Sequence, residues 1–360
     1  MRVLMAAGGT GGHIYPGIAV AREILSRNPE SEVRFVGTAR GLEARIVPEN
    51  GFSLSVIDSA GLKNVGFLGK IKGLLILPKS FFQSWRLIKS FKPNVVVGAG
   101  GYVSGPVVLT AFLMRIPTVI MDSNALPGFT NRILAPFVTR AALAFEDALP
   151  FFGDKGVVTG NPVRQEFFDI KPREPNGKLS ILVFGGSQGA RAINEAMTQA
   201  LFDLKDYKEN LRIVHQTGER DFEQVREAYK REGWDNTDVV AYIHNMPERF
   251  AEADLVICRA GATTCAELAA AGRASIMIPL PTAADDHQRR NAEALQKIGA
   301  TEMILQKDLN GKILSEKIIS FIKSPERLRK MAESARKVAK RDAAQKTVEL
   351  IEEVSKCFAT

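Results

Sequence analysis

Short apolar runs recur along the chain, and several of them end directly in a glycine-rich turn. Residues 3–6 predict a buried strand, and the glycines within residues 8–12 predict a turn. A helical pattern follows from residue 16 to about residue 25, and residues 33–36 predict a second strand. A strand, a turn, a helix and a strand in this order are typical of the start of a parallel sheet.

The same order of elements returns half a chain later. Residues 180–184 predict a strand, residues 185–189 a glycine turn and residues 190–201 a helix. Each of the two openings can begin its own doubly wound domain. The polar stretch 171–177 is rich in proline and glycine and indicates a linker between them.

Two further predicted strands also lead into glycine turns. Residues 95–97 are followed by GAGGYVSGP, and residues 255–258 are followed by RAGATTCAELAAAG. Ligands of open parallel sheets lie beyond the carboxyl ends of the strands. Four such turns from two domains therefore predict a ligand cleft between the domains.

Composition narrows the class of protein. The 360 residues are 45% hydrophobic and 24% charged, which indicates a folded protein rather than a disordered one. Three cysteines form no disulfide framework and fit a reducing cytoplasm. The first apolar run is too short for a signal peptide, and no run approaches the roughly 20 residues of a spanning helix. The net charge of +8 favours an anionic substrate or surface.

The glycine turns suggest phosphate binding. A glycine turn that opens a helix lets backbone N–H groups approach an anion, although it also serves tight packing of helix on strand. Dinucleotide binding fits poorly, because GGTGGH lacks the G-x-G-x-x-G spacing and no acidic residue follows the second strand. Arg40 could meet a 2′-phosphate, which leaves NADP open on this point.

Glu267 lies early in the helix predicted after AGATT. Its carboxylate can accept hydrogen bonds from the two hydroxyls of a ribose, while the amides of Ala262, Thr263 and Thr264 face a diphosphate. The alternative is that Glu267 only complements the helix dipole. Histidines and cysteines show no metal-ligand spacing and there is no Asp-x-Asp pair, so no metal site is visible.

Six motifs, in order, carry a resemblance to a known family. They are GGTGGHIYPGIAVA, GAGGYVSGP, TGNPVR, GGSQGA, CRAGATTCAELAAAG and ADDHQRRNA. Together they resemble the bacterial N-acetylglucosaminyltransferases that convert lipid I into lipid II in peptidoglycan synthesis, over nearly the whole chain. The resemblance implies a GT-B fold, with two Rossmann-like, doubly wound parallel-sheet α/β domains facing a cleft. It also implies inverting transfer of GlcNAc from UDP-GlcNAc to the C4 hydroxyl of MurNAc in lipid I, without a metal or other cofactor.

The same resemblance implies a division of labour between the domains. Residues 1–165 would bind acceptor and membrane, residues 166–340 would bind the UDP-sugar, and a helix over 341–360 would pack back on the first domain. Ile243 would contact the uracil, Glu267 the ribose, and Gln288 with His287 the sugar hydroxyls. The diphosphate would be held by Ser187, Arg164 and the turn Ala262, Thr263, Thr264, Cys265 and Ala266. The sugar would be approached from the N-terminal side by Thr10, Gly11, Gly12 and Asn124.

One stretch departs from the family pattern. Many members carry His-Glu-Gln-Asn where this chain has Met121-Asp122-Ser123-Asn124. The asparagine is kept, whereas the histidine is absent and the carboxylate is one methylene shorter. A role that depends on that histidine or glutamine cannot hold in this chain.

His13 is the expected general base. Inverting transfer needs a group that takes the proton from the acceptor hydroxyl, and an imidazole with an ordinary pKa of about 6.5 suits this task. The alternatives are that His13 fills another role in the active site, or that it only hydrogen-bonds backbone at the helix start. Asp122 is the second candidate base. Arg164 would stabilise the leaving diphosphate, unless it forms an ordinary salt bridge.

Residues 63–92 predict contact with an anionic membrane. Lysines and arginines alternate there with bulky apolar residues, and the stretch has no Asp or Glu. In the alternative, Phe81, Trp85 and Ile88 face the sheet of an ordinary core helix. Nucleic acid is not expected as a partner, because no recognition module accompanies the charge. The expected location is the cytoplasmic face of the bacterial inner membrane, as a peripheral protein with other wall-synthesis proteins as candidate partners.

Two other functions remain open from the residues alone. A UDP-sugar epimerase shares the GT-B architecture, but it needs neither an acceptor nor a membrane segment. A non-catalytic scaffold for wall synthesis would need no intact donor motifs, whereas those of this chain look complete.

Overall fold

A computed structural model describes residues 1–59, 67–173, 177–235, 237–283 and 286–357. The side chains of residues 67–74 and 357 lie outside this description. The chain divides into two compact units, one of residues 1–164 and 340–360 and one of residues 165–339. The crossover at Arg164 and Gln165 comes before the stretch 171–177 that the sequence indicates as a linker.

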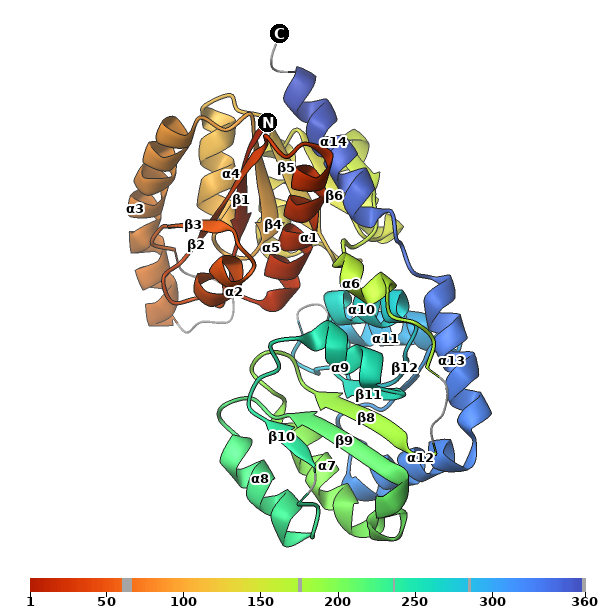
Figure 1. The fold of residues 1–360 in the computed structure, drawn as a ribbon. Helices are drawn as coiled ribbons and strands as arrows, with labels where there is room; N and C mark the ends of the chain where they lie inside the picture. The colour runs from red at the N-terminus through yellow and green to blue at the C-terminus, as the bar shows by residue number, and fades with distance from the viewer. Residues whose placement is uncertain (60–66, 174–176, 236, 284–285, 358–360) are drawn as a thin grey trace. The chain divides into compact units, whose positions relative to one another are not determined.

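The first unit is built on seven parallel strands in the order β3-β2-β1-β4-β5-β6-β7 (Figure 1). The strands are β1 (Arg2–Ala7), β2 (Glu32–Gly37), β3 (Ser53–Val56), β4 (Val95–Gly100), β5 (Thr118–Asp122), β6 (Arg140–Leu143) and β7 (Gly156–Val158). The helices are α1 (Gly11–Arg27), α2 (Glu43–Glu49), α3 (Phe67–Phe91), α4 (Ser104–Leu113), α5 (Phe129–Leu134) and α14 (Ala343–Cys357). Short 3-10 helices cover Ala135–Phe137, Glu146–Phe151 and Gly153–Lys155.

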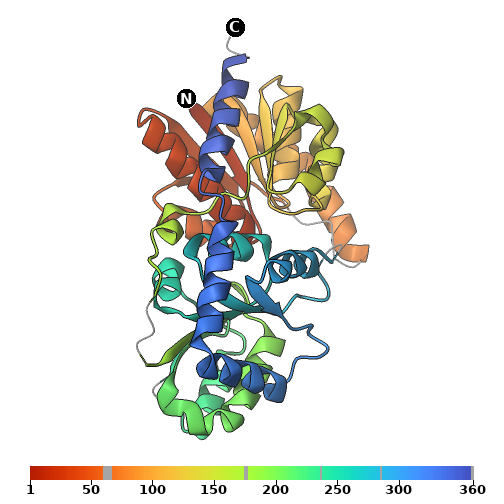
Figure 2. The same ribbon diagram turned by 90° about the vertical axis from the view of Figure 1, so that its right-hand side faces the viewer.

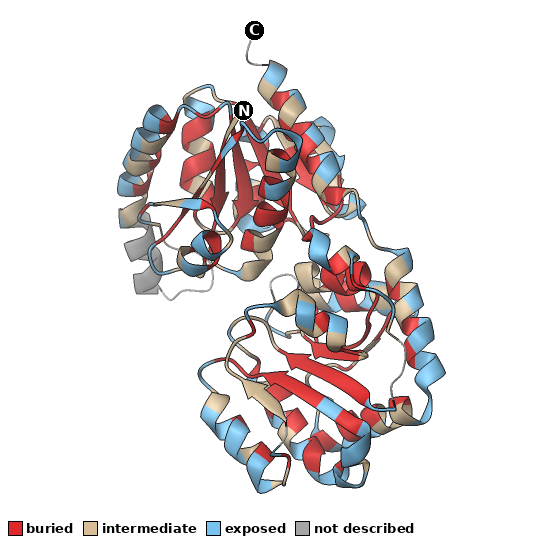
Figure 3. Ribbon diagram, viewed as in Figure 1, coloured by how far each residue is buried: buried red, intermediate tan, exposed pale blue. Residues whose placement is uncertain are grey.

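Alternation along the strands sends side chains to both faces of this sheet. Val3 and Met5 of β1 pack with α1, α2 and α14 on one face. Leu4 and Ala6 pack with α3 and α4 on the other face. Both faces are covered by helices, as expected for a parallel sheet whose strands are apolar throughout (Figure 3).

Helix α14 returns to the first unit after the chain has completed the second. It packs beside α1 and over the strands β4, β5 and β6 (Figure 2). Val348 and Ile351 are fully buried against this core, and Arg27 of α1 forms an ion pair with Glu349 at 3.2 Å. The C-terminal helix is therefore an integral part of the first unit.

The second unit is built on six parallel strands in the order β10-β9-β8-β11-β12-β13. The strands are β8 (Leu179–Phe184), β9 (Leu211–Gln216), β10 (Asp238–Val240), β11 (Leu255–Cys258), β12 (Ala274–Met277) and β13 (Thr301–Met303). The helices are α6 (Gln165–Phe168), α7 (Arg191–Asp203), α8 (Phe222–Arg231), α9 (Met246–Glu252), α10 (Ala262–Ala271), α11 (His287–Lys297), α12 (Gly311–Lys323) and α13 (Pro325–Lys337), with a 3-10 helix at Lys205–Asn210.

The predicted boundaries differ most at the first helix. The sequence places its start at Pro16, whereas α1 begins at Gly11 and carries Pro16 inside it. Thr10 is extended and occupies the N-cap position, so the chain turns into the helix directly after it. The glycine turn is therefore shorter than residues 8–12, and Gly11, Gly12 and His13 belong to the first helical turn.

Candidate active site

The four glycine turns lie at the topological switch points of the two sheets. Strands β1 and β4 are neighbours in the first unit, and the helices that follow them return in opposite directions across the sheet. Strands β8 and β11 hold the same position in the second unit. Ligands of open parallel sheets bind in the crevice at this point. The structure thus places each pair of turns where a ligand site is expected within its own unit.

The two turns of the first unit touch each other closely. Gly101 has a φ of +82°, and a Cβ added to it would lie 2.1 Å from the carbonyl oxygen of Gly8. The ring of Tyr102 lies against Gly9, 3.4 Å from where a Cβ would stand. Backbone and aromatic atoms therefore fill much of this crevice.

Glu43 supports the first turn from the side of β2. It is fully buried, and its carboxylate accepts hydrogen bonds from the N–H of Gly9 at 3.1 Å and from the N–H and hydroxyl of Thr38 at 2.9 Å. Three donors on one carboxylate satisfy its need for hydrogen bonds in the core. Sequence reasoning missed Glu43, because nothing in its local pattern separates it from a surface residue of a helix.

His13 lies in the first turn of α1, with its ring against the turn after β4. A Cβ added to Gly100 would lie 2.3 Å from Nδ1 of the imidazole, so only glycine fits there. Burial lowers the pKa of His13 below 6.5, while the charge of Asp122 and a hydrogen bond with the backbone of Ala99 oppose this shift. The imidazole is therefore neutral near pH 7 and able to accept a proton. The ring nitrogen that does not bond the Ala99 backbone carries the lone pair for that proton.

The carboxylate of Asp122 accepts several hydrogen bonds from the loop that follows β5. One carboxylate oxygen accepts the N–H of Asn124 at 2.9 Å, and the other accepts the N–H of Gly128 at 2.9 Å and the side-chain amide of Asn131 at 2.8 Å. The side chain is only 5% exposed. These donors fix the segment between β5 and α5, and with it the backbone of Asn124. The structure thus gives Asp122 a positioning role beside His13, and its proposed duty as an alternative base stays a prediction.

The remaining predicted residues of the first unit gather near α1. Thr10 is the exposed N-cap of the helix, followed by Gly11 and Gly12 in the first turn. Tyr15 lies one turn further, and the guanidinium of Arg164 stacks over its ring at 4.4 Å from the centroid. Stacking on an aromatic ring holds the plane of the guanidinium in a fixed orientation.

The first turn of the second unit is more open. Gly186 has a φ of +95°, and a Cβ added to it would meet no atom within 4 Å. Ser187 follows it and is half-buried. The turn is fixed instead on its other side: Cβ atoms at Gly189 and Gly218 would lie 1.8 Å and 2.2 Å from the backbone oxygens of Thr217 and Gln188. The sequence QTG at the end of β9 is thus fitted to the turn after β8.

Helix α10 begins at the second turn of this unit. Its N-cap Gly261 leaves the N–H groups of Ala262, Thr263 and Thr264 in the first turn, where helix N–H groups have no partner within the helix. The N–H of Cys265 already bonds the Gly261 carbonyl at 2.9 Å, and its thiol lies buried beside Met277. Burial raises the pKa of this thiol to about 12. Cys265, and by helix geometry Ala266, therefore has no amide to offer a diphosphate.

Glu267 lies in the second turn of α10 and is 8% exposed. The interaction of a charge with the helix dipole is strongest in the first turn and falls off beyond it. The dipole alone therefore explains poorly why a carboxylate occupies this nearly buried position. The carboxylate stands one helical turn beyond the N–H groups of Ala262 to Thr264.

Two further predicted residues take part in loop contacts of the second unit. The N–H of Ile243 bonds the side chain of Gln216 at 2.9 Å, so Ile243 has its carbonyl and its side chain to offer a base. Gln288 accepts the N–H of Leu280 at 3.0 Å and thereby fixes the segment after β12. His287 begins α11 beside it. Sequence reasoning missed Gln216, although its place at the end of a strand and before a glycine is a signal that could have found it.

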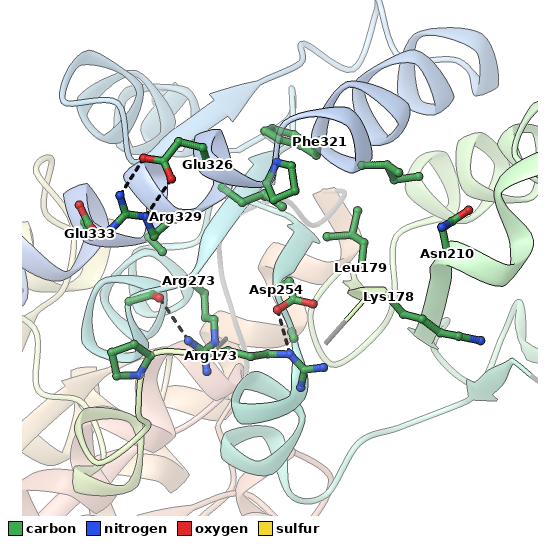
Figure 4. Close-up of a pocket in the computed structure, with 18 of the residues that line it drawn as sticks. Arg173, Lys178, Leu179, Asn210, Asp254, Arg273, Phe321, Glu326, Arg329 and Glu333 are labelled. Atoms are coloured by element: carbon green, nitrogen blue, oxygen red, sulfur yellow. Dashed lines mark hydrogen bonds and ion pairs between the residues drawn. The ribbon is translucent and has the colours of Figure 1, made fainter. Parts of the chain in front are cut away.

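A cavity of about 550 Å³ lies at the amino ends of the strands of the second sheet (Figure 4). It is lined by residues at the amino ends of strands, including Leu179, Asp254 and Arg273. Two ion pairs cross its lining, since Arg173 pairs with Asp254 at 2.8 Å and Arg329 with Glu326 at 2.7 Å. None of the predicted site residues lines it, so it is separate from the glycine turns.

Helix α3 presents a mixed basic and apolar surface. Ser80, Ser84, Ile88 and Phe91 form its buried face, whereas Leu75, Phe82 and Trp85 are 75%, 61% and 41% exposed. The interpretation of Trp85 as a core residue is therefore wrong, because the buried face follows a different helical stripe. Lys79 forms an ion pair with Asp58 at 2.7 Å. Lys63 and the side chains of Lys70 and Lys72 lie outside the described residues.

The described residues offer neither a metal cluster nor a helix that could span a membrane. No group of three His, Cys, Asp or Glu side chains in this part of the chain could hold a metal ion. Within the same residues, no helix combines the length and the apolar character needed to cross a membrane.

Two doubly wound parallel-sheet domains, each with its glycine turns at the switch point, are the architecture of the GT-B class. The family model described as glycosyltransferase family 28 N-terminal domain matches residues 3–143, and that of the family 28 C-terminal domain matches residues 180–347. The chain belongs to glycosyltransferase family 28, in the branch of UDP-N-acetylglucosamine–N-acetylmuramyl-(pentapeptide) pyrophosphoryl-undecaprenol N-acetylglucosamine transferases.

Two relatives and one solved structure show how far the similarity extends. The transferase of that name from Myxococcus xanthus is 47% identical over 97% of this chain and 92% of its own length. The one from Geobacter metallireducens is 47% identical over 97% of each chain. The crystal structure of MurG from Acinetobacter baumannii is 35% identical, with a TM-score of 0.74 over 98% of this chain and 99% of that one.

The fold is also shared with epimerases. A UDP-GlcNAc 2-epimerase from Neisseria meningitidis, bound to UDP-GlcNAc, has a TM-score of 0.68 over 98% of this chain and all of its own. Its identity is only 16%, so this likeness concerns the fold alone. The resemblance predicted from the motifs is confirmed by the transferases, whereas the epimerase alternative shares the architecture only.

Proposed function

We propose that this enzyme transfers GlcNAc from UDP-GlcNAc to the C4 hydroxyl of MurNAc in lipid I, with inversion, giving lipid II. The observation that carries the assignment is the near-complete similarity to transferases of that name, together with intact turns at both switch points. The second unit is proposed as the donor domain and the first as the acceptor domain.

The proposed donor site uses the carboxyl edge of the second sheet. Glu267 accepts hydrogen bonds from the ribose hydroxyls, and Ile243 contacts the uracil. The amides of Ala262 to Thr264 and the hydroxyl of Ser187 hold the diphosphate, because both turns end in helix N-termini. Gln288 and His287 contact the sugar.

The chemical step in this proposal begins at His13. Its neutral imidazole takes the proton of the acceptor hydroxyl as the oxygen attacks C1 of GlcNAc from the face opposite the diphosphate. The bond between C1 and the diphosphate oxygen breaks, and UDP leaves with the bonding electrons. Fixed N–H dipoles and the guanidinium of Arg164 stabilise the charge that develops on UDP. Thr10, Gly11, Gly12 and Asn124 line the acceptor side.

A radiolabel transfer assay tests the function. Purified enzyme is incubated with labelled UDP-GlcNAc, with and without a lipid I analogue. The proposal expects label in lipid II only when the acceptor is present. Conversion of the nucleotide sugar to its 2-epimer without an acceptor would instead support an epimerase, and no turnover at all would support a scaffold.

The proposed location is peripheral, at the cytoplasmic face of the membrane. The exposed Phe82 and Trp85 lie on α3 with Arg86 and Lys89, whose ammonium stands 4.9 Å from the Trp85 ring. Basic and aromatic side chains on one helix are typical of a surface that rests on anionic lipid.

Vesicle sedimentation tests this docking surface. The double change Arg86→Ala and Lys89→Ala should weaken binding to phosphatidylglycerol vesicles about 30-fold, because each basic residue contributes about 1 kcal/mol near such a surface. Lys307→Ala with Lys312→Ala, on exposed positions of the second unit, is the matched control. Equal binding by both double variants would rule out α3 as the docking helix.

A further inference from the structure

Gln216 is a buried polar residue that is not among the residues proposed to contact the substrates. It ends β9 and is 1% exposed. Its side-chain N–H donates to the carbonyl of Gly186 at 2.9 Å, and its side-chain oxygen accepts the N–H of Ile243 at 2.9 Å. One side chain thus joins two segments that are far apart in sequence.

The partners fix which way the amide points. The Gly186 carbonyl can only accept a hydrogen bond, and the Ile243 N–H can only donate one. Only a side chain with a donor and an acceptor at this spacing satisfies both, and only in one orientation. A carboxylate would place an oxygen against the Gly186 carbonyl and add a negative charge under the turn.

The two joined segments belong to different parts of the proposed donor site. Gly186 immediately precedes Ser187 in the turn assigned to the diphosphate, and Ile243 is assigned to the uracil. The turn is also fitted to the end of β9 by the contacts of Gly189 and Gly218. Gln216 therefore stands where the diphosphate turn and the base segment meet.

We propose that Gln216 is a positioning residue, which holds the diphosphate turn and the uracil segment at the spacing that UDP requires. This inference rests on the proposed donor function. In this proposal Gln216 does not touch the nucleotide, and it affects nucleotide binding only through the two loops that it joins. Its neighbour His215 bonds Tyr229 and Asn194 within the core, at 3.0 and 3.1 Å, and is not part of this link.

Two variants separate the two hydrogen bonds. Gln216→Met keeps the length of the side chain and removes both bonds. Gln216→Glu keeps the acceptor for Ile243 but repels the Gly186 carbonyl. We expect Gln216→Met to raise the donor KM and the Kd of UDP about tenfold, and Gln216→Glu to raise both further. The acceptor KM should stay within twofold, and kcat should change less than the donor KM.

A control separates positioning from loss of stability. Ser275→Ala removes a buried hydrogen bond between Ser275 of β12 and Thr301 of β13, at the amino end of the same sheet. Melting temperatures of all variants are measured beside UDP titration calorimetry. A Ser275→Ala enzyme that is less stable but binds UDP normally, beside the expected loss in Gln216→Met, supports the proposal.

Different results would overturn the positioning role of Gln216 and the donor assignment itself. Normal UDP binding in both Gln216 variants, with weak binding in Glu267→Ala, would overturn the positioning role and leave the donor site standing. Failure of the unchanged enzyme to bind UDP would overturn the donor assignment itself. If Gln216→Met does not fold, Gln216→Glu and its UDP affinity decide the question in the same way.

Discussion

The two units share one strand order, to which the first adds the edge strand β7, but they use the space at the switch point differently. In the first unit, Gly101 meets the Gly8 carbonyl and His13 lies over Gly100, so the crevice between β1 and β4 is largely filled. In the second unit, Gly186 faces open space, and the turn after β8 is fixed to β9 instead of to its partner across the switch point. One crevice thus presents an imidazole, and the other leaves room for a ligand.

The two buried residues that support these turns, Glu43 and Gln216, differ because they meet different hydrogen-bonding groups. Glu43 meets donors only, namely two backbone N–H groups and a hydroxyl, and a carboxylate satisfies all of them. Gln216 meets one acceptor and one donor, which only an amide satisfies. A neutral support also keeps negative charge away from the turn proposed for the diphosphate. The fold is repeated, and the chemistry at each switch point is set by a few buried side chains.

The largest effect on activity should come from replacing His13, which lies at the filled crevice of the first unit. His13→Ala should lower kcat about 10²–10⁴-fold, because the acceptor hydroxyl loses its proton acceptor. The donor KM should change little, since the proposed nucleotide site lies in the other unit. Steady-state kinetics with varied UDP-GlcNAc separate the two quantities.

His13→Asn is the matched control, because it can hydrogen-bond but cannot act as a base near neutral pH. If Asn restores most of the rate, His13 only positions groups, and Asp122 becomes the next residue to test. An unchanged kcat in His13→Ala would make the residue structural.

The next largest effect should come from the open crevice. Glu267→Ala should raise the donor KM and the Kd of UDP about 10–150-fold, since hydrogen bonds to a charged group contribute about 1.5–3 kcal/mol. Calorimetry with UDP and with uracil alone provides the measurement and its control. Equal losses for both ligands would contradict a role at the ribose, because free uracil lacks that sugar.

A smaller effect tests the packing difference itself. Gly101→Ala and Gly186→Ala both place a side chain at positive φ, which costs about 1–3 kcal/mol. Only Gly101→Ala also drives a Cβ into backbone, so it should lose about 1–3 kcal/mol more in denaturant unfolding. Equal losses would show that the first crevice is not filled as described.

The glycine turns could be predicted from the sequence, whereas the contacts between the turns could not. Strand, glycine turn and helix have strong local patterns, so both sheets and all four turns could be predicted. The closure of one crevice depends on Gly8 and Gly101, which are far apart along the chain, and no local pattern reports such a contact. The roles of Glu43 and Gln216 could not be predicted either, because their hydrogen-bond partners come from other parts of the chain. The first-turn amides of α10 could not be distinguished from that of Cys265 until the start of the helix was known.

The smallest expected effect is a change of rate with pH, and it bears on the state of His13. Burial lowers the pKa of this imidazole below 6.5, so kcat/KM should be flat from pH 8 to 7 and should fall only below pH 6.5. The sign follows from the base role: the neutral ring above its pKa accepts the proton, and the protonated ring below it cannot. The residual rate of His13→Asn should lack this acidic limb. A limb centred above pH 6.5 would mean that the Asp122 charge and the Ala99 hydrogen bond outweigh burial, and a limb kept in His13→Asn would move the base to another residue.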